Sequence, residues 1–308
     1  MNTWSHPNRV TPFLKEGYNM LKIYAGIITY NPDMDKLKNN VNVVLPQVDG
    51  LIIVDNDSDN LTDIKKFIAD LGDPITLIEN QDNKGVAYAL NQIFKCADRA
   101  SVDWVLTLDD DSQCYPNLVG MYKGFIDSNK VENLASLTCL REDRKYKEKN
   151  VSNIIGGADT VQFSQDFSFV DTCITSGNLV AVEAWKNVKG FKNKLFIDMV
   201  DDDFCLRLRG AGYNIVRISK FGYLHELGND IIKVRFLGRE KTVFAYSLKR
   251  KYYTARNVRY MVRTYNLGLV NNYNSYLIKR VLGTLLYEKN KIKGLKAYIK
   301  GYKAGKKL

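Results

Sequence analysis

Four short apolar runs alternate with helical patterns early in the chain, and this alternation constrains the fold more than any other feature. The runs lie at 21–30, 50–54, 75–80 and 104–108, and stretches with helical periodicity separate them. Parallel strands need a crossover of a dozen or more residues, which a helix commonly supplies. The pattern therefore predicts βαβ units, and hence an α/β fold with a mostly parallel, right-handed, doubly wound sheet flanked by helices.

The fourth run stops abruptly at three consecutive carboxylates, Asp109, Asp110 and Asp111. Open α/β sheets bind their ligands beyond the carboxyl ends of the strands, so these acids stand where a substrate site is expected. Three adjacent carboxylates repel one another, and a divalent cation such as Mn²⁺ or Mg²⁺ is their natural partner. An acidic turn that caps the next helix is the alternative explanation for the isolated triplet.

The remaining strand ends argue against two common nucleotide-binding folds. The first strand leads into Tyr30, Asn31 and Pro32. The sequence contains neither the G-x-G-x-x-G motif of dinucleotide-binding folds nor the G-x-x-x-x-G-K-[ST] motif of P-loop proteins. Asp55 follows the second strand instead, and a carboxylate can accept a hydrogen bond from the N–H of a pyrimidine base. The sequence therefore favours a site in which acids at the strand ends hold a metal ion against a diphosphate.

The charge is unevenly distributed along the 308 residues. Residues 241–308 hold 17 Lys or Arg and one acid, a net charge of +16, which leaves −5 for residues 1–240 out of a total of +11. Basic residues interleaved with Tyr, Leu and Ile predict amphipathic helices that lie on anionic lipid. Nucleic acid and a merely solvated lysine face are the alternatives, but the chain offers no nucleic-acid module, so no nucleic-acid partner is expected.

These observations predict three segments and an intracellular location. Residues 1–20 are interpreted as a flexible leader or a non-native addition, 21–240 as the catalytic domain, and 241–308 as a basic amphipathic helical region. The five cysteines form no C-x-x-C pair, which disfavours a zinc site or a disulfide framework and favours reduced thiols. No apolar run is long enough to cross a bilayer and no secretory signal is evident.

The order of short motifs over residues 21–260 resembles the family 2 inverting glycosyltransferases with the GT-A fold. The matching motifs are Thr29–Pro32, Val54–Ser58, Asn83–Ala87, Ala89–Asn91, Leu108–Ser112, Ser176–Leu179, Gly190–Phe191, Asp198–Arg207, Gly212–Tyr213 and His225–Gly228. Three features look most like bacterial rhamnosyltransferases: Leu-Asp-x-Asp-Ser, Val-Asp-x-acid-x-Cys-x-Arg, and the late Tyr252-Tyr253-x-x-Arg256-Asn257.

The resemblance implies a binding site for a nucleotide sugar. Its residues are Thr29, Tyr30, Asn31, Asp55, Asn83, Lys84, Gly85, Asp109, Asp110, Ser176, Gly177 and Arg207. Asp55 would bind the pyrimidine base, with a turn-forming role before Asn56 as its alternative. Asn83 to Gly85 would cross near the diphosphate, although a bare loop with a helix N-cap at Asn83 fits nearly as well. Ser176 and Gly177 would contact donor or acceptor, or form a turn beside a strand.

The resemblance also implies the metal ligands. Asp111 would bind the metal ion directly. Asp109 would lie nearer the ribose and would also be a metal ligand. His225 would complete the metal coordination or contact the diphosphate. A core or loop histidine is the alternative for His225. If the strand geometry persists, the side chain of Asp110 lies on the face of the strand opposite to Asp109 and Asp111, which favours a structural role. Asp110 is nevertheless kept among the candidate residues of the donor site.

A second cluster of acids surrounds the expected general base. Asp201 aligns with the catalytic acid of the family and begins a predicted helix over 201–210, where a plain N-cap is the competing role. Many members carry Glu-Asp where this chain has Val200-Asp201, which leaves Asp198 or Asp202 as possible substitutes. Arg207 is expected to pair with these acids or with phosphate.

The sequence thus predicts a metal-dependent glycosyltransferase that moves a sugar from dTDP- or UDP-sugar, with dTDP-rhamnose favoured. The expected acceptor is a saccharide or a polyprenyl-diphosphate-linked glycan in bacterial surface polysaccharide synthesis, such as O-antigen. The expected location is the cytoplasm, peripheral on the inner face of the cell membrane. A metal-dependent nucleotidyl or phosphoryl transferase, and a binding protein without catalysis, are the alternatives.

Overall fold

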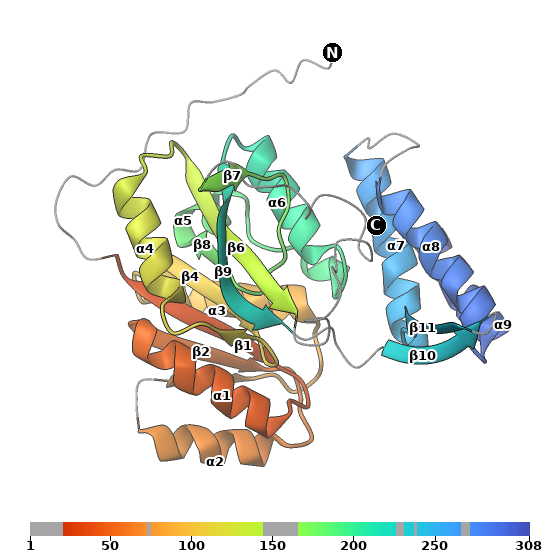
Figure 1. Cartoon of the computed structure of the whole chain (residues 1–308), viewed down its shortest axis with the longest axis horizontal. Coiled ribbons are helices and arrows are strands. Elements are labelled where there is room, and N and C mark those ends of the chain that lie inside the picture. The colour runs from red at the N-terminus through yellow and green to blue at the C-terminus, as the bar shows by residue number, and fades with distance from the viewer. Residues whose placement is uncertain (1–20, 73–74, 144–165, 226–230, 237–238, 266–271) are drawn as a thin grey trace. The chain divides into compact units, whose positions relative to one another are not determined.

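The computed structural model describes residues 21–72, 75–143, 166–225, 231–236, 239–265 and 272–308 (Figure 1). The predicted leader at 1–20 lies outside these residues. The described chain forms two compact units. The first holds mainly 21–142, 166–191 and 201–225, and the second holds 192–200 together with the chain from 231 onward. The boundary expected at residue 240 stays a prediction.

The first unit alternates strands and helices as expected. In chain order its elements are β1 (Ile23–Thr29), α1 (Met34–Val44), the 3₁₀ turn η1 (Leu45–Gln47), β2 (Gly50–Asp55), α2 (Leu61–Leu71), β3 (Ile75–Glu79), α3 (Val86–Arg99), β4 (Trp104–Asp109), β5 (Gln113–Cys114), α4 (Leu118–Ser128), β6 (Leu134–Asp143), β7 (Phe167–Phe169), β8 (Asn178–Ala181), α5 (Val182–Asn187), α6 (Val200–Gly210) and β9 (Asn214–His225). All four strands predicted before residue 110 are therefore present.

The sheet runs in the order β3-β2-β1-β4-β8-β6-β9-β5, with β7 also paired to β9. β3, β2, β1 and β4 are mutually parallel, whereas β4 pairs antiparallel with β8. In the parallel part, Thr29 is opposite Asp55, and Ile28 is opposite Asp109. The two expected acidic positions therefore stand at the same edge of the sheet, at the carboxyl ends of neighbouring strands.

Helices cover both faces of this sheet, as the alternation of strand side chains requires. One face joins Ile23, Ala25 and Ile27 of β1 to buried side chains of α1, α2 and α4 in a single core. On the other face α3 packs against β1 and β2, and it also contacts α5. At Gly26 an added Cβ would lie 2.4 Å from Cγ2 of Ile93, so glycine permits the close approach of α3. Each fully buried aliphatic side chain contributes about 1.5–3 kcal/mol.

The second unit is mostly helical. It consists of the 3₁₀ turn η4 (Asn193–Leu195), the antiparallel hairpin β10 (Ile231–Phe236) and β11 (Arg239–Phe244), and the helices α7 (Leu248–Thr264), α8 (Asn272–Tyr287) and α9 (Lys291–Ala304). The helices expected in the basic C-terminal region are confirmed, and α7 packs against both α8 and α9 (Figure 1). None of the helices in the described ranges combines the length and apolar character needed to cross a membrane.

Close packing in the second unit depends on one buried ion pair and on small residues. Lys251 of α7 is nearly inaccessible and pairs with Glu288 at 2.7 Å, while also donating to the carbonyl of Tyr246. Gly301 of α9 lies against α7, where an added Cβ would come within 2.0 Å of the carbonyl oxygen of Tyr252. α7 therefore differs from α8 and α9 in that one of its basic residues, Lys251, is buried and does not face solvent.

Candidate active site

The base-reading candidate Asp55 is fully buried at the end of β2. Its Oδ1 accepts from the hydroxyl of Thr29 at 2.8 Å and from the hydroxyl of Ser58 at 2.5 Å, and its Oδ2 accepts from the backbone N–H of Ser58 at 2.9 Å. The bond to the N–H of Ser58 is the turn-forming contact expected of the alternative role. Three donors stabilise the charge of this buried carboxylate.

The loop after β1 is tied to the loop after β2. The backbone N–H of Asn31 donates to Oγ of Ser58 at 2.8 Å, and the side-chain oxygen of Asn31 accepts from the N–H of Asp59 at 2.7 Å. Asn31 adopts a left-handed backbone with φ of 52°, a conformation that Asn tolerates better than most residues. Tyr30 remains 53% exposed beside this loop, so its ring is accessible to a ligand.

The segment from Asn83 to Gly85 turns sharply before α3. The side-chain oxygen of Asn83 accepts from the N–H of Gly85 at 3.0 Å, and Gly85 itself is the N-cap residue, with φ of 85°. The alternative that Asn83 caps α3 is therefore wrong. Lys84 forms an ion pair with Asp82 at 3.4 Å and lies over the ring of Tyr88, and because it is substantially exposed this pair contributes little to stability.

Asp109 to Ser112 form a tight turn that distant segments hold in place. The carbonyl of Asp109 accepts from Nδ2 of Asn40 at 2.9 Å and from the N–H of Ser112 at 3.2 Å. Its own N–H donates to Oγ of Ser176 at 3.1 Å, and that hydroxyl donates to Oγ of Ser112 at 2.8 Å. The structure thus brings Ser176 directly beside the acidic turn, although 67 residues separate it from Asp109.

Gly177 follows Ser176 at a position where only glycine fits. Its φ is 72°, and an added Cβ would lie 2.3 Å from the ring of Tyr223. Its N–H donates to the carbonyl of Thr107 at 2.8 Å, and its carbonyl accepts from the hydroxyl of Tyr122 at 2.6 Å. The absence of a side chain therefore lets the backbone pass between β4 and β9.

The antiparallel pairing of β5 with β9 brings the backbone of His225 to the same edge. Gln113 is opposite Leu224 and Cys114 is opposite Tyr223. Continuing this register by one residue aligns His225 with Ser112, next to Asp111. The side chain of His225 is not among the described atoms, so its proposed metal contact stays a prediction.

The acidic turn is electrostatically poised for a cation. Burial, together with the neighbouring charges of Asp111 and Asp109, raises the pKa of Asp110 to about 7. No group of three or more His, Cys, Asp or Glu side chains in the described part of the chain forms a complete metal cage. Mg²⁺ and similar hard ions commonly bind through one or two carboxylates together with substrate phosphates, and the donor set of this turn fits that pattern.

The acids at 201–203 have separate surroundings in the first turn of α6. Asp203 is fully buried and accepts from Nε of Arg207 at 2.9 Å, one turn later. Arg207 also donates to the carbonyl of Val188 at 2.6 Å, and its Nη2 is buried with no hydrogen-bond partner among the described residues. The expected pairing of Arg207 with an acid of this cluster is confirmed, and the partner is Asp203.

Asp201 and Asp202 are half-buried in the same turn. Oδ1 of Asp201 accepts from the N–H of Asp202 at 3.2 Å. The helix buries Phe204, Cys205 and Leu208, which helical spacing places on one stripe with Asp201. Asp201 therefore lies at the N-terminal end of the buried stripe of α6.

Asp198, in the second unit, is strongly engaged. Its Oδ1 accepts from Nε and Nη2 of Arg250 at 3.3 and 3.2 Å, and its Oδ2 accepts from the hydroxyl of Thr254 at 2.5 Å. Its side chain is 9% exposed. The carboxylate of Asp198 therefore accepts three hydrogen bonds from α7.

Sequence reasoning overlooked two asparagines that support the site. The side chain of Asn91 donates to the carbonyl of Phe191 at 2.7 Å and accepts from the N–H of Phe191 and from Nε1 of Trp185. Asn80 pairs its amide with Gln92 and also donates to Asn56, next to Asp55. Asn91 ends the Ala89–Asn91 motif of the sequence. Its position on the buried face of a helix was the feature that could have indicated this hydrogen-bonding role.

The mostly parallel sheet, the helices on its faces and the C-terminal helices form the GT-A fold. Residues 24–173 match the family described as Glycosyl transferase family 2. This match, which covers just under half of the chain, indicates a glycosyltransferase of that family.

Three known proteins illustrate the similarity. The dTDP-rhamnosyl transferase RfbF of Shigella flexneri is 25% identical over 283 residues, covering 90% of this chain and 93% of that protein. TarS 1-349 of S. aureus in complex with UDP-GlcNAc has a TM-score of 0.56 at 15% identity, covering 91% of this chain and 79% of that one. The mannosyltransferase PcManGT of Pyrobaculum calidifontis, in complex with GDP-Man and Mn²⁺, has a TM-score of 0.55 at 13% identity, covering 93% and 74%. The two structures support the fold alone.

Proposed function

We propose that the chain is an inverting, metal-dependent transferase that moves L-rhamnose from dTDP-rhamnose to a saccharide or polyprenyl-diphosphate-linked acceptor. Such a step serves the synthesis of bacterial surface polysaccharide, including O-antigen. The observation that carries the proposal is the meeting of Asp55 and the Asp109–Asp111 turn at one sheet edge. The near full-length similarity to a dTDP-rhamnosyl transferase favours rhamnose, and a UDP-sugar is the alternative donor.

On the donor side, each candidate has a distinct task. Asp55, Thr29 and Tyr30 bind the pyrimidine base, and Asn31 shapes the loop beside it. Asn83, Lys84 and Gly85 approach the diphosphate from the turn before α3. Nη2 of Arg207, which is buried and has no hydrogen-bond partner within the described part of the chain, supports a further phosphate contact. Ser176 and Gly177 adjoin the sugar through their position beside the acidic turn.

Asp111, Asp109 and His225 would hold Mn²⁺ or Mg²⁺ against the diphosphate. When bound, the ion neutralises the charge that develops on the departing nucleoside diphosphate. Asp110 belongs to the same turn, where burial and then the charges of Asp111 and Asp109 raise its pKa. The mannosyltransferase PcManGT, which shares this fold, was solved in complex with GDP-Man and Mn²⁺.

Asp201 acts as the general base. It takes the proton of the acceptor hydroxyl as that oxygen bonds to the anomeric carbon, while the bond from this carbon to the diphosphate breaks on the opposite face. The result is inversion. The alignment of Asp201 with the catalytic acid of the family favours Asp201, and Asp198 and Asp202 are the alternatives.

A basic and apolar surface on α8 and α9 supports binding to an anionic membrane at its cytoplasmic face. Ile278, Leu282 and Leu286 follow one another at four-residue spacing on α8 and are 58%, 50% and 50% exposed. Residues 272–308 hold ten Lys or Arg and one acid. Apolar side chains that enter the lipid boundary, rimmed by cations, are typical of an interfacial helix.

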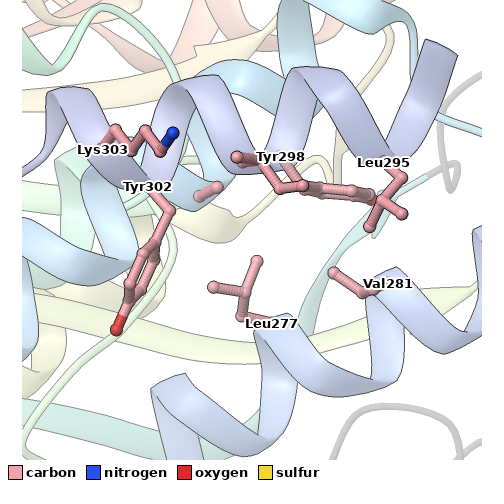
Figure 2. Close-up of a pocket in the computed structure, with 8 residues that line it drawn as sticks. Leu277, Val281, Leu295, Tyr298, Tyr302 and Lys303 are labelled. Carbon is pink, nitrogen blue, oxygen red and sulfur yellow. The ribbon is translucent and has the colours of Figure 1, made fainter. Parts of the chain in front are cut away.

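An apolar pocket of about 250 Å³ adjoins this surface. Figure 2 shows Leu277 and Val281 of α8 facing Leu295 and Tyr298 of α9 across it, with Lys303 near its rim. An opening of this kind beside a membrane-binding surface suits the acyl or prenyl chain of a lipid.

Calorimetric titration of dTDP-, UDP- and GDP-sugars, with and without Mn²⁺, tests the proposal, with Asp111→Asn as control. Metal-dependent binding of dTDP-rhamnose that the variant loses is the expected result. Binding of a UDP-sugar alone would change the donor. Cleavage of the nucleotide without any acceptor sugar would favour the nucleotidyl or phosphoryl transferase, and no binding of any donor would overturn the proposal.

A further inference from the structure

The loop that follows α5, residues 187–191, has an unusual backbone. Lys189 and Gly190 have φ values of 61° and 67°, both in the left-handed region. A residue with a side chain rarely adopts this conformation, and it persists only where the surroundings hold it in place. The loop belongs to the first unit, together with α3 and residues 201–210 of α6, so its contacts with these helices lie within one compact body.

Asn91 of α3 holds this loop by a reciprocal pair of hydrogen bonds. Its Nδ2 donates to the carbonyl of Phe191 at 2.7 Å, and its Oδ1 accepts from the N–H of the same residue at 2.8 Å. Oδ1 also accepts from Nε1 of Trp185 at 3.0 Å. At Gly190 an added Cβ would lie 2.5 Å from this oxygen, so glycine lets the loop approach α3. Because donor and acceptor of one amide bind one backbone residue, the position of the loop is tightly specified.

The same loop contacts α6 along its length. The ring of Phe191 stacks on Phe204, with centroids 4.1 Å apart and planes 28° apart. The carbonyl of Val188 accepts from Nη1 of Arg207 at 2.6 Å. These two contacts fall on successive turns of α6, directly after the turn that contains the carboxylate of Asp201. The loop therefore lies between α3 and the helix of the proposed base.

Two further contacts extend this connection. Nδ2 of Asn187 donates to the hydroxyl of Tyr213, which follows α6, at 2.7 Å. On the α3 side, the ring of Phe94 lies 5.7 Å from that of Phe191 and 5.4 Å from that of Trp185, measured between centroids. Polar contacts to single atoms specify one position of the loop, whereas apolar packing of rings alone would tolerate several.

We propose that Asn91, acting through the 187–191 loop, fixes the position of α6 and thereby orients Asp201 for proton transfer. The inference rests on the proposed function, because it takes the base from the first turn of α6. Asn91 lies on the helix whose N-terminal turn approaches the diphosphate in that proposal, so α3 connects the donor side of the site to the base. Asn91 is a positioning residue, and its effect reaches the reaction through Asp201.

The test compares Asn91→Ala with Asn129→Ala in the full chain. Nδ2 of Asn129 also donates to a main-chain carbonyl, that of Phe125 at 3.1 Å, but at the end of α4. Misplacement of a reacting group by about 1 Å costs about 100-fold in rate. We expect Asn91→Ala to lose about that factor in kcat while the Kd for dTDP-rhamnose changes less than about threefold, and Asn129→Ala to retain both.

Hydrogen exchange of peptides covering 201–210 provides a readout that needs no activity. We expect faster exchange there in Asn91→Ala, with exchange over β1 and β2 unchanged. Trp185→Phe removes one of the three hydrogen bonds to Asn91 and keeps a ring beside Phe94, and it serves if Asn91→Ala fails to fold. Its expected loss in kcat is about fivefold, because two of the three bonds remain.

Three results would overturn this role of Asn91: an unchanged kcat, a kcat loss matched by an equal loss of donor affinity, or unchanged exchange over 201–210. Failure of the wild-type protein to transfer any sugar would refute the proposed function instead. In that case exchange over 201–210 alone decides whether Asn91 holds α6 in place.

Discussion

The hydroxyl of Thr29 donates to the carboxylate of Asp55 at 2.8 Å, and neither side chain is accessible to solvent. The two residues are opposite each other on β1 and β2. The bond therefore joins the ends of two central strands where the candidate base pocket begins. A buried carboxylate is costly unless donors surround it, so Thr29 contributes both to stability and to the orientation of Asp55.

Thr29→Val removes one of three hydrogen bonds to a buried carboxylate. We expect a loss of about 1–3 kcal/mol in the free energy of unfolding, together with weaker donor binding. Urea unfolding measures the first effect and calorimetry the second. Thr76→Val, at an exposed position on β3, is the matched control and should stay within about 0.5 kcal/mol of the wild type. Equal stability of the two variants would contradict the assigned role of Thr29.

Removal of divalent metal should abolish transfer. The acidic turn contains Asp109, Asp110 and Asp111, and the pKa of Asp110 is raised to about 7 by burial and by the two neighbouring charges. A chelator should therefore suppress both donor binding and turnover, and added Mn²⁺ should restore them. The assay is product formation before chelation, after chelation and after Mn²⁺ addition. Undiminished turnover in the chelated protein would exclude a metal role for this turn.

Gly177→Ala should destabilise the protein strongly. The left-handed φ of 72° costs a residue with a Cβ about 1–2 kcal/mol. Overlap with the ring of Tyr223 adds about 1–3 kcal/mol. Gly124→Ala is the control, because Gly124 lies exposed in α4 with no atom within 4 Å of the added Cβ. That control should gain about 0.5–1 kcal/mol, and urea midpoints compare the two. A neutral Gly177→Ala would mean that the backbone shifts easily here.

Asp201→Asn should retain donor binding and lose transfer. A general base contributes about 10²- to 10⁴-fold to the rate, and the amide cannot accept the acceptor proton in the same way. Steady-state kinetics and donor titration separate the two effects. Asp202→Asn, one position later, is the control and should keep most of the activity. If Asp202→Asn is the inactive variant and Asp201→Asn is active, the base is Asp202.

Leu282→Glu combined with Leu286→Glu should weaken binding to anionic vesicles. Both side chains are half exposed on α8, so the fold tolerates the change while the apolar contact with lipid is lost. Phe169→Glu, at an exposed position in the first unit, is the control and should bind as the wild type does. Co-sedimentation with vesicles of phosphatidylglycerol and phosphatidylcholine measures the difference. Equal binding of the two variants would remove α8 from the membrane surface.

Local patterns in the sequence determined the parallel half of the sheet and its acidic edge. The apolar runs 50–54 and 104–108 form β2 and β4. They could be predicted because the spacing of apolar side chains along the chain indicates which secondary structure can bury them. Asp55 and Asp109 follow those runs directly, so their common edge follows from parallel pairing. The helical period of α6 likewise placed Phe204, Cys205 and Leu208 on its buried side.

Only the tertiary structure decided which distant residues join that edge. Antiparallel pairing of β5 with β9 brings the backbone of His225 to the acidic turn, and Ser176 reaches Asp109 across 67 residues. Asn257 binds the segment before α6 from a helix about sixty residues later. Such contacts depend on how whole elements pack, whereas periodicity reports only which side of one element is apolar. For that reason the sequence named Thr29 and Ser176 as candidates for the site, but not the hydrogen bonds by which they hold Asp55 and Asp109.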